Sequence, residues 1–87
     1  MQNAVTHIIT EIESGFVFDS HYVISQILRL YSDAYLHFAG PNESTAQMHG
    51  RIAQIISASS SVRQLPQSSW SINIHGTPSK CALWERN

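Results

Sequence analysis

Apolar side chains recur along the first part of the chain at the three- and four-residue steps of an α-helix. The first stripe consists of Val5, Ile8, Ile9 and Ile12. It predicts a helix over residues 3–14, with Asn3 as its N-cap and Gly15 as the residue that ends it. The apolar run 16–18 that follows is too short for a helix and predicts a small β-strand.

A second, longer stripe predicts a helix over residues 20–38. Its apolar positions are Ile24, Ile27, Leu28, Tyr31, Tyr35 and Phe38. Asp19 or Ser20 can cap its start, and Gly40 with Pro41 ends it. Because this segment is apolar on nearly all sides, we expect it in the centre of the fold or at a dimer interface.

A third helix is predicted from the segment "STAQMHGRIAQII", residues 44–56, and extends to about Ser57. One side of it is apolar, with Met48, Ile52, Ile55 and Ile56. Asn42, Ser44 or Thr45 can cap it. Gly50 lies inside the helix at a cost of about 1 kcal/mol relative to Ala, which favours close approach of a neighbouring helix or a ligand there.

The remainder of the chain predicts an irregular Ser-rich connection and a β-hairpin. The connection, "SASSSVRQLPQSS", contains Pro66 and is too polar to form core. In "SWSINIH", apolar and polar residues then alternate with the period of a half-buried strand. Gly76 and Pro78 indicate a turn, and residues 81–84 return as the second strand. We expect Trp70 and Trp84 to pack the hairpin against a helix or across the strands.

The composition favours one small folded domain over residues 1–87. The 43% share of apolar residues argues against disorder. Charged residues make up only 13%, which favours a surface partly covered by a partner, and a homodimer would enlarge the small core. The net charge of −1 argues against strong nucleic-acid binding, although protonation of the five histidines would make the chain positive.

The chain carries no sign of export or membrane insertion. Its single cysteine, Cys81, cannot form an internal disulfide and suits a reducing compartment. The N-terminal segment lacks the basic and apolar regions of a signal peptide, and no apolar stretch approaches the ~18 residues of a membrane span. We therefore expect a cytoplasmic protein.

The polar side of the third helix contains residue types that read DNA. Ser44, Gln47, Arg51 and Gln54 follow one another at steps of three and four. Arg pairs with guanine and Gln with adenine in the major groove, yet the same pattern is common on solvated helices. Arg51, Arg63 and Lys80, with Arg86 nearby, could contact phosphates, or they could be scattered solubilising charges.

Metal binding and catalysis are not expected from the sequence. His75 and Cys81 stand six positions apart, but a structural zinc site needs four ligands, typically in Cys-rich pairs. We therefore predict no metal and no cofactor, with His75 in a turn and Cys81 as a small apolar group. No nucleophile with an adjacent base and no Gly-rich phosphate loop is found, so the chain is not expected to be an enzyme.

The order helix, short strand, helix, helix, hairpin resembles the winged helix-turn-helix family from about Val5 to Trp84. The resemblance implies an α+β fold of three helices with a small antiparallel sheet, in which the first strand pairs with the C-terminal hairpin. It also implies that the third helix is the recognition helix and that the turn from His75 to Lys80 is the wing. The outward-facing residues of that helix would be Ser44, Thr45, Gln47, Arg51 and Gln54.

Two functions follow from this pattern. The first is a small transcriptional regulator that binds double-stranded DNA as a homodimer, with two half-sites about one helical turn apart. Replacement of Arg51 should then weaken binding. The second is a protein–protein interaction module on the same fold, an adaptor or an inhibitor, which the neutral charge favours.

Overall fold

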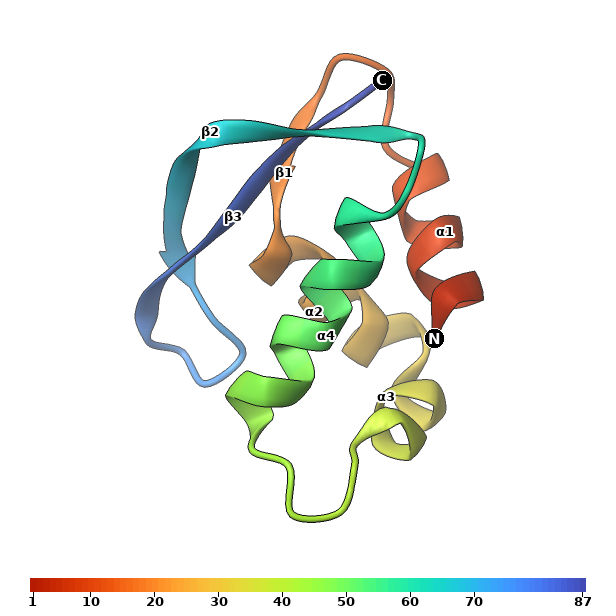
Figure 1. The fold of residues 1–87 in the computed structure, drawn as a ribbon, viewed down its shortest axis with the longest axis vertical. Helices are drawn as coiled ribbons and strands as arrows, with labels where there is room; N and C mark the ends of the chain where they lie inside the picture. Colours follow the sequence, from red (N-terminus) through yellow and green to blue (C-terminus); the bar gives the residue numbers. More distant parts are fainter.

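Four helices are followed by a long antiparallel hairpin, so the fold is α+β (Figure 1). The computed structural model describes every residue from Met1 to Asn87. The elements are α1 (Gln2–Thr10), β1 (Val17–Asp19), α2 (Ser20–Leu30), α3 (Ser32–Phe38), α4 (Thr45–Ser57), β2 (Val62–Ile72) and β3 (Pro78–Arg86). None of the helices combines the length and the apolar character needed to cross a bilayer.

The first helix is shorter than predicted. α1 ends at Thr10, because the N–H of Ile12 bonds the carbonyl of Ile9 at 3.0 Å, three residues back, and tightens the last turn. Gly15 does not end the helix. It adopts a positive φ of 89°, and its N–H donates to Arg86 O at 2.7 Å, which brings the chain to the edge of β3.

The prediction of one helix over 20–38, and with it the prediction of three helices, is wrong. At Tyr31 the backbone leaves the helical region (φ −137°, ψ 46°), and α3 starts afresh at Ser32. The break redirects the second half of the apolar stripe. Tyr35 thereby reaches the core beside α4, where only 8% of it is exposed. The periodicity is the same on both sides of the break, so the pattern alone did not reveal it.

The three strands form one antiparallel sheet in the order β1-β3-β2. The predicted strand at 16–18 is confirmed, with a shift of one residue. Phe18 in β1 pairs with Trp84 in β3, and their rings stack with centroids 6.1 Å apart. The central position of β3 ties the N-terminal part of the chain to the hairpin.

The predicted irregular connection before Trp70 is wrong in its second half, because β2 already begins at Val62. The register changes between Gln64 and Ser68, and Pro66 lies within this bulge, where its missing N–H costs no ladder bond. β2 is also an edge strand, which tolerates Pro and Ser. The bend along β2 is visible in Figure 1.

The hairpin turn lies earlier than the predicted 75–80. It spans 73–77 and is closed by the N–H of Asn73 bonding Thr77 O at 2.9 Å. The side-chain Oδ1 of Asn73 accepts two further bonds, from the N–H groups of His75 and Thr77. Lys80 is consequently not a turn residue. It belongs to β3 and pairs with Trp70.

One core connects the helices and the sheet. Its buried members are Val5, Ile8, Ile9, Phe18, Val23, Ile24, Ile27, Tyr35, Met48, Ile52, Ile56 and Trp84. The predicted apolar side of α4 is therefore confirmed.

The expectation for the two tryptophans holds only for Trp84, which is fully buried. Trp70 is 72% exposed and lies after the bulge, on the edge strand β2, where it pairs with Lys80.

Candidate functional site

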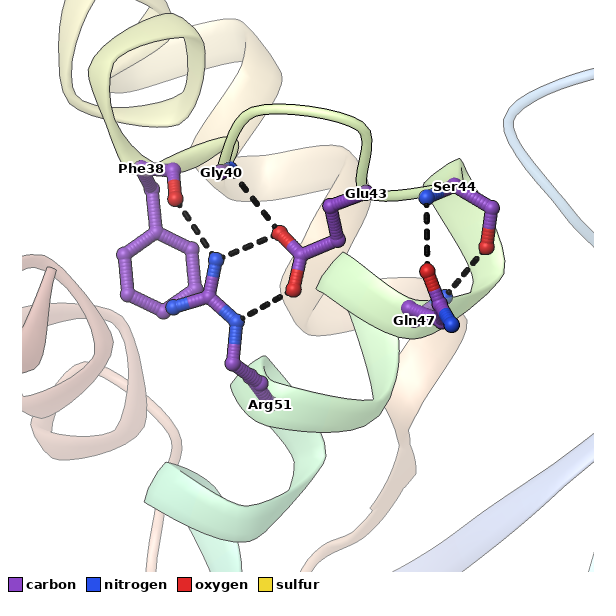
Figure 2. A network of polar contacts seen from close by, with 6 residues as sticks. All are labelled: Phe38, Gly40, Glu43, Ser44, Gln47 and Arg51. Atoms are coloured by element: carbon purple, nitrogen blue, oxygen red, sulfur yellow. Dashed lines mark hydrogen bonds and ion pairs between the residues drawn. The ribbon is translucent and has the colours of Figure 1, made fainter.

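The start of α4 is fixed by a reciprocal pair of hydrogen bonds between Ser44 and Gln47 (Figure 2). The Oγ of Ser44 accepts from the Gln47 N–H at 3.1 Å, and the Oε1 of Gln47 accepts from the Ser44 N–H at 2.9 Å. This capping box satisfies two backbone donors that the helix itself leaves free. Both side chains are exposed, but each already has a structural role.

Arg51 points toward α3 and holds the α3–α4 connection (Figure 2). Its Nε donates to Glu43 Oε2 at 2.7 Å, and its Nη2 donates to Glu43 Oε1 at 2.5 Å and to Phe38 O at 2.7 Å. The guanidinium also lies 4.0 Å from the centre of the Phe38 ring. The Gly40 N–H adds a bond to Glu43 Oε1. Arg51 is therefore engaged within the chain.

The electrostatics of this network follow from its hydrogen bonds. Hydrogen bonds from Arg51, and then from the Gly40 N–H, lower the pKa of Glu43 from 4.5 to about 2. Hydrogen bonding to Glu43 in turn raises the pKa of Arg51. The pair is thus fully charged at neutral pH, and its two formal charges cancel locally.

A groove of about 340 Å³ lies between α4 and the hairpin. Thr45, His49 and Gly50 line it from α4, and His75 and Lys80 line it from the hairpin. Of the residues predicted to bind DNA, only Thr45 and Lys80 lie at this groove. Lys80 is exposed and forms no ion pair, so its charge is available to a ligand.

The remaining predicted site residues are distributed elsewhere. Gln54 is exposed and lies with Arg51 and Phe38 at a second hollow, of about 400 Å³, on the α3 side of α4. Arg63 is at the start of β2 and forms an ion pair with Glu85. Arg86 donates to the Ile9 carbonyl at 3.2 Å. The sequence-predicted residues are therefore divided among the groove, the second hollow, the capping box of α4 and the start of β2.

Three histidines, His21, His49 and His75, line the groove, and no pattern in the sequence predicts this. The hydroxyl of Tyr35 lies 2.8 Å from His49 Nε2. Burial lowers the pKa of His49, and the nearby His75 and His21 lower it further. These residues come from a helix interior, a turn and a helix start, so no local sequence signal connects them.

At one side of the groove, Asp19, His21 and Cys81 bring their ligand atoms within 4.8 Å of one another. Burial alone would raise the pKa of Asp19, but hydrogen bonds from Ser69, the Tyr22 N–H and Ser71, together with His21, lower it overall. Asp19 and His21 flank the start of α2, whereas Cys81 lies on β3. The short spacing in the sequence links Cys81 with His75 and not with Asp19 or His21, because residues about 60 positions apart give no spacing pattern.

Comparison with family models, with curated proteins and with solved structures gives no match. The functional interpretation therefore depends on the fold, the groove and the chemistry of the side chains around it.

Proposed function

We propose that this chain is a small DNA-binding transcriptional regulator of the winged helix-turn-helix type, with α4 as the recognition helix and the β2–β3 hairpin as the wing. The observation that carries the proposal is the topology. A short strand after the first helix joins the edge of a C-terminal hairpin in the order β1-β3-β2, and α4 directly precedes that hairpin. α3 is an extra element relative to the three-helix pattern.

The exposed side of α4 supports this role because several of its residues have small side chains or none. Ala46, Gly50 and Ser57 are all exposed. A Cβ built on Gly50 would contact nothing within 4 Å, so internal packing does not require a glycine there. A glycine that costs the helix about 1 kcal/mol without serving the core favours close approach of an external surface. The major groove, about 12 Å wide, accepts a helix of this kind.

The proposed contacts divide between bases and phosphates. The side chain of Gln54 is exposed and forms no hydrogen bond within the chain, and with Gln47 it is the residue type that pairs with adenine. Lys80 and Thr45 border the groove beside the wing and suit phosphate contacts. Arg63 can exchange Glu85 for a phosphate, since an exposed ion pair contributes only ~0–1 kcal/mol. Arg51 would position the α3–α4 connection instead of reading a base.

The test is a fluorescence-anisotropy titration of mixed-sequence duplex DNA at two salt concentrations. Lys80→Gln should weaken binding and reduce the slope of log affinity against log salt by about 1. Gly50→Glu should abolish binding, because it adds bulk and negative charge at the proposed contact. Arg29→Gln is the matched control: Arg29 is exposed on α2, forms no ion pair and does not line the groove.

If wild-type protein shows no salt-dependent binding, or if Lys80→Gln and Arg29→Gln behave alike, the proposal fails. Circular dichroism of each variant separates loss of binding from loss of fold. The homodimer is part of the same proposal, and sedimentation of the protein with and without DNA measures it.

A protein–protein interaction module is the second candidate, and the exposed apolar side chains favour it. Trp70 and Ile72 on the hairpin are 72% and 59% exposed, and Phe16 and Val17 before and in β1 are 59% and 52% exposed. Large apolar groups of this kind are typical of docking surfaces. Under this alternative, Trp70→Ser would abolish partner capture in a pull-down, while no DNA binding would be measurable even at low salt.

A further inference from the structure

Three different metal-ligating side chains converge where the start of α2 meets the middle of β3. The carboxylate of Asp19, the imidazole of His21 and the thiol of Cys81 have their ligand atoms within 4.8 Å of one another, and all three residues are half-buried. We propose that they form a mononuclear site for a divalent transition metal, with Zn²⁺ as the ion that fits best. None of these three ligands is a residue proposed to contact DNA, although His21 and Cys81 line the same groove as Thr45 and Lys80.

The donor set matches the preferences of zinc. Zn²⁺ binds thiolate at about 2.3 Å and imidazole nitrogen or carboxylate oxygen at about 2.0–2.2 Å, in tetrahedral geometry. Those bond lengths place the donors about 3.3–3.7 Å apart, so the ligand atoms would have to approach one another by at most about 1.5 Å. Three protein ligands and one water are the arrangement of an open zinc site. Binding releases the thiol proton to solvent.

Serines from the hairpin already orient two of the ligands. The hydroxyls of Ser69 and Ser71 donate to Asp19 Oδ2 at 2.7 and 2.8 Å. His21 has a serine beside each ring nitrogen, with Ser71 Oγ 2.6 Å from Nδ1 and Ser79 Oγ 3.2 Å from Nε2. A ligating histidine uses one nitrogen for the metal and the other for a hydrogen bond that fixes the ring. The metal would therefore replace one serine and leave the other in place.

A separate observation points to a missing polar partner at the same place. Ser20 is only 5% exposed, and its buried hydroxyl has no hydrogen-bond partner. Ser20 lines the groove together with His21 and Cys81. Buried hydroxyls without a partner are rare and costly. A water bound to the metal in the fourth position would supply a partner on this side of the groove.

The chelator-treated full-length chain should be titrated with Zn²⁺ by calorimetry and with Co²⁺ by absorption spectroscopy. We expect one equivalent of either metal and, with Co²⁺, a thiolate-to-cobalt charge-transfer band in the near ultraviolet. Cys81→Ser should eliminate that band, and His21→Gln should weaken Zn²⁺ affinity by at least about tenfold. His37→Gln is the control, because His37 is exposed on α3 and bonds only the Asp33 carbonyl.

A second measurement does not depend on the folding of a variant. In wild-type protein, one equivalent of Zn²⁺ should slow alkylation of Cys81, the only thiol, by at least about tenfold, in line with loss of the free thiolate. The inference is overturned if Co²⁺ gives no charge-transfer band, if the band survives in Cys81→Ser, or if Zn²⁺ leaves the alkylation rate unchanged. Equal loss of affinity in His21→Gln and His37→Gln would also overturn it.

Discussion

Glu43 is the residue on which the α3–α4 connection depends. Its carboxylate accepts bonds from both Arg51 and the Gly40 N–H, so one side chain joins the end of α3, the connection and the middle of α4. A charged hydrogen bond of this kind is stronger than a neutral one, but it exists only while the carboxylate is ionised. The contribution of this network to the stability of the fold should therefore depend on pH.

We predict that this network is lost in acid. The pKa of Glu43 is about 2 in the folded chain and 4.5 ordinarily, so its contribution to stability is present above pH 4.5 and lost as pH falls through about 2. In Glu43→Gln the thermal midpoint should be lower than in wild type above pH 4.5, and the difference should shrink toward zero near pH 2. Circular dichroism against temperature measures both midpoints.

Glu13→Gln serves as the control for that series, because Glu13 is exposed and forms no ion pair. Its midpoint should follow the wild-type midpoint throughout. If the difference in thermal midpoint between Glu43→Gln and wild type persists unchanged to pH 2, the substitution lowers stability through altered packing and not through loss of the charge.

The role of Arg51 could not be predicted from its position on the helix, whereas the apolar side of α4 could. Met48, Ile52 and Ile56 are buried, as predicted. The buried side of a helix can be predicted because it follows from the spacing of apolar residues along a short segment. The direction of a long polar side chain depends on what lies beside it in space. Arg51 contacts Glu43 and Phe38 through the way the α3–α4 connection folds back, which helical periodicity does not reveal.

At the scale of elements, the ends of helices were easier to predict than their continuity. Ser44 was one of three predicted caps for α4, and it is the N-cap in the structure. Capping uses a residue and its third neighbour, so a short segment contains the whole signal. β2 is the opposite case. Its Pro66 lies in the segment predicted as an irregular connection, but a bulge in an edge strand accommodates it, and only the pairing with β3 reveals that.

We predict that Ser44→Ala destabilises the chain by about 1 kcal/mol, because the Gln47 N–H loses its acceptor. Thr45→Ala, one position later, removes an exposed hydroxyl with no hydrogen bond and should change stability by less than about 0.5 kcal/mol. Urea unfolding followed by circular dichroism gives both values. Equal effects at the two positions would show that the cap does not contribute to stability.

At the scale of the whole molecule, Trp84 connects the parts of the fold. It is fully buried, stacks on Phe18 of β1, and belongs to the same core cluster as residues from all four helices. The Cys81 site and the groove beside α4 both lie where this sheet meets the helices. Residues far apart in sequence are assembled there by topology, which is why spacing patterns did not show them.

A single core should also mean a single unfolding transition. In Trp70→Phe, the remaining fluorescence comes from Trp84 and should be blue-shifted and weakly quenched by acrylamide, because Trp84 is 0% exposed. Its change in urea should coincide with the loss of helical circular dichroism, as two-state unfolding requires. The complementary Trp84→Phe leaves only Trp70, which is 72% exposed, and should give red-shifted, strongly quenched emission and lower stability. Two separated transitions in Trp70→Phe would instead show that the sheet and the helices unfold independently. The groove between them would then lack the rigid walls that both proposals require.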